Sequence, residues 1–171
     1  IKNVEILGQY GLRKTEARAT SITTPYTTSL KGIVQGKFPA QDGVSEYYSQ
    51  NLRNYYRAQA SYKMDKGKHQ GKLMAGFQAE DNLFTSFSAS KRGFEMNRYY
   101  LDNGDGATAS ASGGASEWSM ASFYGRLNYD YAEKYLFEMT GRYDGSSRFA
   151  DDLRWGFFPS FSAGWVVTKE N

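Results

Sequence analysis

The densest group of possible metal-binding oxygens lies in one short polar segment, Asp102-Asn103-Gly104-Asp105-Gly106. Calcium takes several oxygen ligands from a flexible turn, and such loops usually end on a Glu that binds the ion through both carboxylate oxygens. That Glu is missing here, because residues 107–116, with Gly113 among them, are only Ala, Gly, Ser and Thr. We therefore predict a polar loop tip and no metal site.

A second group has the residue types of a hydrolase: Ser146 and Ser147 as nucleophiles, with Asp144 and His69 as partners. A serine nucleophile needs its base within hydrogen-bond reach. His69 follows the turn signal Lys66-Gly67-Lys68, which the strand pattern places at the opposite end from Ser146, roughly 25 Å away across an apolar band. We predict no catalytic residue, no cofactor and no enzymatic activity.

Composition excludes further classes. The 171 residues include no cysteine and one histidine, so disulfide scaffolds, thiol nucleophiles and multi-histidine metal sites are excluded. The net charge is only +3 and no basic run stands out, so no nucleic-acid partner is expected. No apolar run reaches the roughly 20 residues of a transmembrane helix. Aromatic residues make up 16% of the chain, as suits β-structure with amphipathic faces.

Apolar and polar residues alternate along much of the chain, a pattern that predicts β-strands. Six strands of about ten residues are expected, which is the length that crosses an outer membrane when tilted. They are Val4–Leu12, Tyr55–Met64, Lys72–Glu80, Ser122–Tyr131, Lys134–Asp144 and Pro159–Thr168. The fold class predicted is all-β, an antiparallel transmembrane β-barrel segment.

Each predicted strand has one apolar, aromatic face and one polar face. Lipid would not accept the charges of the polar faces, whereas a water-filled or plug-filled lumen would. The residues predicted to face the lumen are Arg57, Lys72, Arg126, Glu138 and Arg142. Those predicted to face lipid are Phe123, Leu127, Tyr135, Phe137, Met139, Phe161 and Trp165.

The predicted connections alternate in length, as periplasmic turns and extracellular loops do in outer-membrane barrels. Asp65–Lys68 and Ala132–Lys134 are tight turns, expected at the same end of the structure. Two connections are long, from about Thr15 to Gln50 and from about Asp81 to Glu117. The aromatic residues predicted to contact cargo or a partner from these extracellular loops are Tyr47, Tyr48, Tyr99, Tyr100 and Trp118.

Two connections are expected to differ in order. The segment from Ala107 to Ser116 has no large side chain and is predicted to be mobile. The connection from Gly145 to Gly156 has turn formers and aromatic residues, and its arginines, Arg148 and Arg154, bracket Asp151 and Asp152. We predict an ordered scaffold for the extracellular rim there, not a substrate site.

The segment from Phe123 to Trp165 resembles a known family. It carries Phe123-Tyr-Gly-Arg-Leu-Asn-Tyr-Asp-Tyr131, Glu133-Lys-Tyr-Leu136, Arg142-Tyr-Asp-Gly-Ser-Ser-Arg-Phe149 and Arg154-Trp-Gly-Phe-Phe-Pro-Ser-Phe-Ser-Ala-Gly-Trp165. These blocks, in this order, resemble the mid-barrel signature of SusC/RagA-type TonB-dependent outer-membrane transporters of Bacteroidota. The resemblance is strong from about Ser122 to Glu170 and weaker from Ile1 to Asn82.

The resemblance implies a 22-stranded barrel closed by an N-terminal plug, in the cell outer membrane. Residues 1–171 would form about six of its strands, and the plug and the TonB box would be absent from this chain. It also implies a SusD-like surface lipoprotein and the TonB-ExbB-ExbD complex as partners, and active import of glycans or oligopeptides. The alternatives are a small complete outer-membrane barrel and a secreted, soluble glycan-binding β-domain, which would alternate in the same way.

Overall fold

The computed structural model describes residues 3–94 and 98–170, and strands dominate them. Six strands form one antiparallel sheet in the order β1-β4-β5-β6-β7-β8, and β2 and β3 form a separate two-stranded sheet. The strands are β1 (Val4–Thr23), β2 (Tyr26–Leu30), β3 (Ile33–Phe38), β4 (Gly43–Lys66), β5 (His69–Arg92), β6 (Ser110–Tyr131), β7 (Tyr135–Ser146) and β8 (Trp155–Trp165). The predicted all-β, antiparallel fold class is confirmed.

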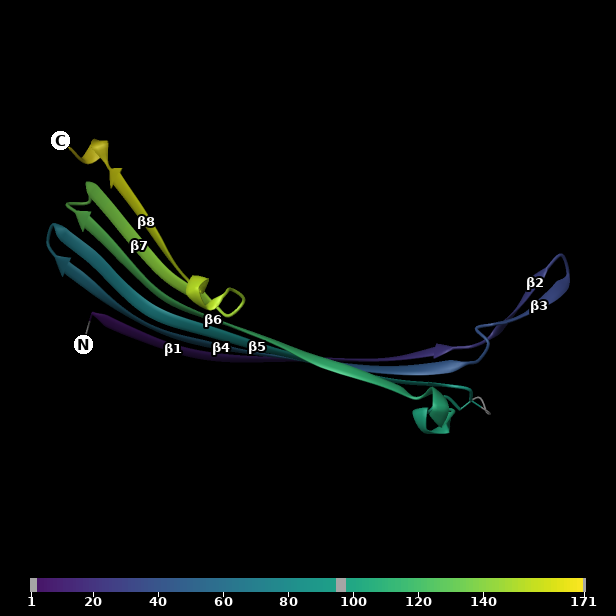
Figure 1. Cartoon of the computed structure of the whole chain (residues 1–171). Coiled ribbons are helices and arrows are strands. Elements are labelled where there is room, and N and C mark those ends of the chain that lie inside the picture. The colour runs from purple at the N-terminus through teal and green to yellow at the C-terminus, as the bar shows by residue number, and fades with distance from the viewer. Residues whose placement is uncertain (1–2, 95–97, 171) are drawn as a thin grey trace. The chain divides into compact units, whose positions relative to one another are not determined.

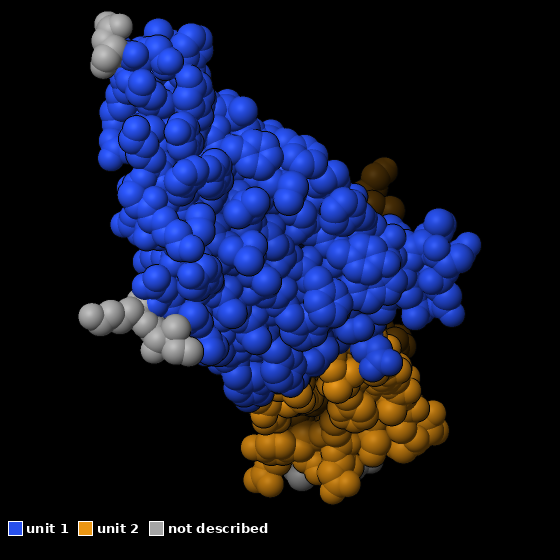
Figure 2. All heavy atoms as spheres, turned by 90° about the vertical axis from the view of Figure 1, so that its left-hand side faces the viewer, with its two compact units in different colours: residues 1–13, 53–82, 117–171 blue, residues 14–52, 83–116 orange. Residues whose placement is uncertain are grey.

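The chain divides into two compact units, coloured separately in Figure 2. The first comprises residues 1–13, 53–82 and 117–171 and contains a part of all six strands of the large sheet. In Figure 1 these strands lie side by side as an open sheet, with β1 and β8 at its edges. The sheet does not close on itself, as expected for a section of a larger barrel.

Register keeps the two faces of the first unit chemically distinct. Leu127 pairs with Met139, which pairs with Phe161 on β8, and Tyr135 pairs with both Tyr131 and Trp165. Directly paired residues point to the same face, so these aromatic and aliphatic side chains share one face. We call it the apolar face. The other face carries the intervening polar residues of the same strands, and we call it the polar face.

Two tight turns lie beside each other in the first unit. β4 and β5 are joined through Gly67, which has φ of 63°, a conformation that favours glycine. β6 and β7 are joined by Ala132 and Glu133, both at positive φ, and the Asp130 carboxylate accepts a bond from the Glu133 amide at 2.6 Å. The Ala132 amide donates to the Lys68 carbonyl at 2.7 Å, which confirms that both turns are at one end.

A short 3-10 helix, η4 (Val167–Lys169), follows β8. Glu170, just after it, accepts bonds from the Tyr135 hydroxyl and the Trp165 indole, both at 3.2 Å. Lys169 forms an ion pair with Glu133 of the β6–β7 turn. Aromatic residues with polar partners near strand ends are typical of the girdles at a membrane interface.

The second unit, residues 14–52 and 83–116, corrects the prediction of long loops. β1 continues to Thr23, β4 begins at Gly43, β5 continues to Arg92 and β6 begins at Ser110. Many side chains of these strand segments are polar, and some, such as Thr20 with Glu46, also form hydrogen bonds across the strands. The alternation of apolar and polar residues that marks a strand in sequence is therefore weak there. The remaining connections are residues 24–42, which contain the β2–β3 hairpin, and residues 93–109, which contain η1 (Leu101–Asn103) and η2 (Gly106–Thr108).

The predicted mobile segment is also corrected, because residues 110–116 belong to β6. Their small side chains allow close approach to β5: a Cβ on Gly113 would lie 2.9 Å from the Ser86 carbonyl oxygen. The Ser112 and Ser88 hydroxyls are 2.8 Å apart. A run of Ala, Ser and Gly therefore packs as a strand with small side chains, and its lack of bulk does not indicate disorder.

The described residues contain almost no apolar core. Val44 is the one hydrophobic residue among them that is fully buried, at 2% exposure. By contrast Phe161 is 65% exposed and Trp165 is 58% exposed on the apolar face. A soluble sandwich would cover this face with a second sheet. No helix in the described part is both long and apolar enough to cross a membrane.

Candidate functional site

The polar face of the first unit brings together the five residues predicted to face a lumen. Arg126 pairs with Thr140, between Glu138 and Arg142 on β7, so these three charges share the face. Arg57 donates to the Tyr124 hydroxyl at 3.0 Å, and Tyr124 pairs with Arg142. Lys72 and Glu138 line one depression. Their common face is observed, whereas their exposure to a lumen is a proposal.

Tyr124 is the centre of this face. Its hydroxyl accepts from the Arg57 Nε atom and lies 3.3 Å from the Gln59 side-chain oxygen. The guanidinium carbons of Arg57 and Arg142 lie 5.9 and 5.7 Å from its ring centroid, within the range of cation–π attraction. Sequence alternation placed Tyr124 on the polar face but gave no sign that it organises two arginines.

Tyr124 lies over a glycine, and this contact gives a testable expectation. A Cβ on Gly76 would come within 2.4 Å of the Tyr124 ring. We expect Gly76→Ala to displace the ring, weaken its bond to Arg57 and cost about 1–3 kcal/mol through overpacking. Urea unfolding of the full-length protein measures this. Gly8→Ala is the matched control, because nothing lies within 4 Å of its Cβ position. Equal stability of the two variants would contradict the expectation.

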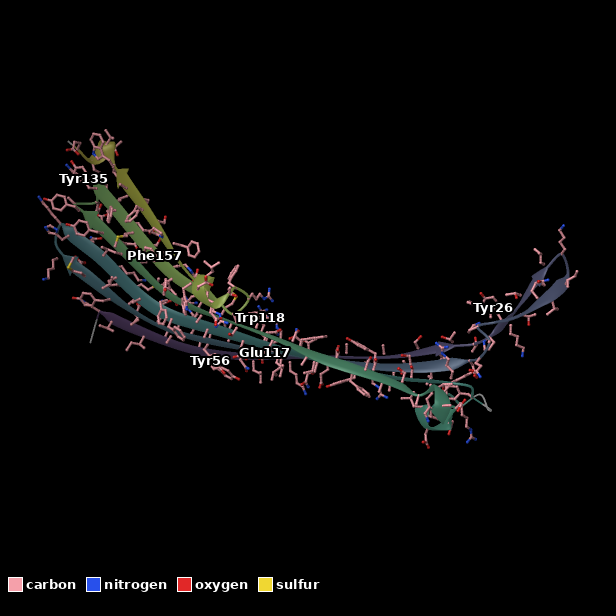
Figure 3. All side chains as sticks on the ribbon, in the orientation of Figure 1. Tyr26, Tyr56, Glu117, Trp118, Tyr135 and Phe157 are labelled. Atoms are coloured by element: carbon pink, nitrogen blue, oxygen red, sulfur yellow. The ribbon has the colours of Figure 1, made fainter. Side chains whose placement is uncertain are left out.

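A second group of residues on the polar face is arranged around the aromatic ring of Trp118. The Arg53 and Arg148 guanidinium carbons lie 5.4 and 4.8 Å from its ring centroid. Arg53 also forms an ion pair with Glu80 on the neighbouring strand β5. Trp118 was predicted in a loop as a contact for cargo; it lies in β6 instead, next to Glu117 (Figure 3).

Hydrogen bonds between β6 and the β7–β8 connection set the position of Arg148. The Ser119 amide donates to the Ser147 hydroxyl at 2.8 Å, and the Ser147 amide donates to the Ser119 carbonyl at 2.9 Å. Ser147 directly precedes Arg148 and Ser119 directly follows Trp118 in sequence, so the bonds between the two serines bring the guanidinium of Arg148 to the ring. These bonds attach the connection to β6, whereas its role as a scaffold of the extracellular rim stays a prediction.

The predicted ion pairs of that connection are correct for one arginine only. Arg154 lies 2.5 Å from Asp151, and the two flank η3 (Asp151–Leu153). Arg148 does not pair with Asp151 or Asp152, because the two serine bonds direct it to Trp118. The short sequence separation suggested that Arg148 pairs with these carboxylates, but the hydrogen bonds between Ser119 and Ser147 determine which group Arg148 contacts.

The other predicted aromatic contacts belong to the second unit. Tyr47 and Tyr48 lie in β4, not in a loop, and as neighbours on a strand they point to opposite faces. Tyr99 and Tyr100 do lie in a connection, where Tyr99 packs edge-on against Phe94 at 5.5 Å and Tyr100 is exposed. Contact of these residues with cargo or a partner stays a prediction.

One of these tyrosines organises a charged group outside the apolar region. Glu16 accepts from Tyr48 at 2.6 Å and from Gln50 at 3.1 Å, and it lies 2.8 Å from Lys14. These partners stabilise the carboxylate and lower the pKa of Glu16 to about 2, with Lys14 as the main cause.

The depressed pKa of Glu16 predicts a direction of pH dependence. A carboxyl with a lowered pKa contributes stability above its unfolded value, near 4.5, and loses it as the pH falls toward about 2. We expect the Glu16 side chain to remain ionised at pH 3.5, as measured by ¹³C NMR of the labelled carboxyl. In a Lys14→Gln variant it should titrate at a higher pH. Titration near pH 4.5 in the unaltered protein would contradict the assignment.

The residues whose types could support catalysis or metal binding serve local roles. His69 lies 2.7 Å from the Tyr129 hydroxyl beside the turns, whereas Ser146 is at the other end of β7. These positions do not assemble a nucleophile with its base. The Asp105 carboxylate accepts from the Ala107 amide at 2.9 Å and caps η2.

The turn end of the polar face is hollowed into a depression of about 670 Å³. Its charged lining mixes acids and bases from four strands: Lys63, Asp65, Lys72, Asp130 and Glu138. Asn128 donates to Glu138 across β6 and β7. Such mixed charges suit contact with water or with another polar protein surface.

An open antiparallel sheet with one uncovered apolar face and one charged face is typical of the wall of a transmembrane β-barrel. Comparison with known proteins then identifies the family. Residues 5–170 match the family model described as "TonB dependent receptor-like, beta-barrel". The chain belongs to this family.

Individual relatives agree with the family. The chain is 31% identical over 173 residues to the TonB-dependent receptor SusC of Bacteroides thetaiotaomicron, covering 99% of this chain and 15% of SusC. It is 34% identical over 113 residues to TonB-dependent receptor P3 of Formosa agariphila, covering 65% of this chain and 11% of P3. This chain therefore spans about a seventh or less of the length of these two relatives.

Solved structures share the fold. The chain superimposes on the RagAB peptide transporter with a TM-score of 0.86 at 22% identity, over 99% of this chain and 19% of that one. It also matches the "open-open" state of the RagAB peptide importer, with a TM-score of 0.82 and 23% identity over 95% of this chain and 18% of that one. The recognised resemblance to SusC/RagA-type transporters is confirmed.

Proposed function

We propose that this chain forms part of the wall of a TonB-dependent active importer in the outer membrane. The observation that carries the proposal is the register of β6, β7 and β8, which gathers aromatic and aliphatic side chains on one face and charges on the other. The apolar face meets the lipid bilayer and the polar face lines the lumen. The chain supplies wall, lumen lining and surface segments, and the family consists of receptors, not enzymes.

The apolar face has a polar limit that fits a membrane boundary. The Tyr10 hydroxyl donates to Asn54 at 3.0 Å, and Asn54 donates to Asp81 at 2.7 Å. Farther along β1, in the second unit, the alternate positions that hold Ile6 and Leu12 in the first unit hold Lys14 and Glu16. A face that is apolar up to such a limit and charged beyond it is expected where a strand leaves the hydrocarbon layer.

The cargo proposed is a glycan or an oligopeptide, taken up with a SusD-like surface lipoprotein and driven by the TonB-ExbB-ExbD complex. The support is similarity to SusC and to a structure described as a peptide transporter. The plug and the TonB box would belong to parts of the full-length protein outside this chain. The unit carrying Tyr47, Tyr48, Tyr99 and Tyr100 would contact cargo or the lipoprotein.

Uptake in cells tests this function. Cells with the full-length gene should accumulate a labelled oligopeptide or oligosaccharide mixture, and accumulation should stop when either that gene or TonB is deleted. The matched control is a deletion of the TonB box alone in the full-length gene. It should also stop accumulation, although it leaves the barrel intact. Uptake that is unchanged without TonB would contradict active import.

A further inference from the structure

The polar face is unevenly charged along its length. Near the β7–β8 connection it carries five arginines against two carboxylates: Arg53, Arg57, Arg126, Arg142 and Arg148 against Glu80 and Asp144. Toward the turns it carries Lys63 and Lys72 against Glu5, Asp65, Asp130 and Glu138. Counted over these residues, and leaving out Lys66, Lys68 and Lys134 at the turns, one half of the face is positive and the other half negative.

Ion pairs neutralise only part of the positive half. Arg53 pairs with Glu80, and Arg142 pairs with Asp144 at 3.1 Å. Among the described residues, no carboxylate lies within ion-pair distance of Arg57, Arg126 or Arg148. Arg126 and Arg148 therefore remain available to an anion. Arg57 donates to Tyr124 and, at 2.7 Å, to the Gln59 side-chain oxygen, so only its remaining N–H donors are available.

Neighbouring residues hold Arg148 in a position that suits contact with an anion. Its backbone amide donates to the Ser146 hydroxyl at 3.3 Å, and the Ser147–Ser119 bonds hold the connection against β6. The guanidinium carbon lies 4.8 Å from the Trp118 ring centroid, and the cation–π attraction at this distance does not require a hydrogen bond from the N–H donors. A preorganised guanidinium binds a carboxylate through two parallel hydrogen bonds.

Arg57 and Arg126 form a second positively charged group on the same face. Arg126 lies two residues from Tyr124 on β6, and Arg57 bonds to the Tyr124 hydroxyl. Trp118 lies six residues before Tyr124 on the same strand, a separation of about 20 Å. Two positive groups spaced in this way along one strand offer successive contacts to a chain with several anionic groups.

We propose that Arg148 on Trp118, followed by Arg57 and Arg126 around Tyr124, is a binding site for carboxylate groups of the cargo. This inference rests on the proposed import function and names the chemistry of its cargo. The carboxylates come from an acidic oligosaccharide or from an acidic oligopeptide, which share this recognition. The negative half toward the turns then weakens the hold on an anion that has passed the arginines.

The test uses the full-length protein purified in detergent, with cells expressing it for uptake. The probes are an oligogalacturonate against a neutral glucose oligosaccharide of equal length, and a Glu-rich octapeptide against its Gln counterpart. The variants are Arg148→Gln and the double substitution Arg57→Gln with Arg126→Gln. Arg154→Gln is the matched control, because Arg154 belongs to the same connection but pairs with Asp151.

We expect Arg148→Gln to weaken calorimetric binding of one acidic probe about tenfold and to leave its neutral counterpart unchanged. The double variant should weaken the same acidic probe, and Arg154→Gln should change neither. Which acidic probe responds distinguishes a saccharide from a peptide source.

Equal binding of acidic and neutral probes in the unaltered protein would overturn the site. So would an equal loss for both probes in Arg148→Gln, which would indicate contact with the plug or a purely structural role. TonB-dependent uptake of a neutral probe in the same cells would show that import itself stands when the carboxylate site fails. Loss of all TonB-dependent uptake would refute the import function instead.

Discussion

Replacing Met139 by arginine should cost roughly 2–4 kcal/mol of barrel stability, the cost of placing a charge on the lipid face near the middle of the membrane. Met139 lies between Leu127 and Phe161 on the apolar face and is about midway along β7. An arginine there has no carboxylate among its paired neighbours, and at this depth its side chain has the longest way to reach water.

The measurement is urea unfolding of the full-length protein in lipid vesicles. Ser162→Arg is the matched control, because Ser162 is on the next strand, faces the polar side and pairs with Glu138. We expect the control to change stability by less than about 1 kcal/mol, since its charge remains in water beside a carboxylate. A larger cost for Ser162→Arg than for Met139→Arg would show that the two faces are assigned the wrong way round.

Sequence alternation predicted the two faces because a strand has a side-chain period of two and a barrel wall differs strongly between its sides. The faces of Leu127, Met139 and Phe161 followed directly from their spacing. Alternation could not predict where β1 and β5 end or where β4 and β6 begin, because the contrast between the two faces weakens in residues 14–23, 43–52, 83–92 and 110–116. There the strands are held by pairs such as Tyr48 with Glu16, which are 32 residues apart in sequence.

Prediction from sequence alternation has the same limit for the polar face. The spacing assigned Arg57 and Arg142 to it, but their meeting at Tyr124 depends on the order of β4, β5, β6 and β7 in the sheet. The contact of Arg148 with Trp118 depends on two serine bonds across strands. Residues far apart in sequence give no local signal for such contacts, so the sequence around Arg148 indicates a scaffold and not the contact with Trp118.

The 171-residue chain expressed by itself should not fold as a stable monomer in plain buffer. β1 and β8 are the edges of the described sheet and present unpaired backbone groups, which favour pairing with other chains. The apolar face is also uncovered, and Val44 alone supplies a fully buried apolar side chain among the described residues. A single sheet of this kind does not bury enough apolar surface to offset the entropy of ordering its chain.

Sedimentation and denaturant unfolding test this expectation together. The isolated chain should sediment as large, heterogeneous species or remain unfolded, and its circular dichroism should change gradually with urea. The full-length protein in detergent is the control and should unfold in one steep transition, because closure of the barrel pairs every edge strand. A monomer of the isolated chain that unfolds cooperatively, at a midpoint independent of protein concentration, would favour the soluble β-domain and contradict a barrel wall. Such a monomer would have to cover Phe161 and Trp165, which the open sheet leaves exposed.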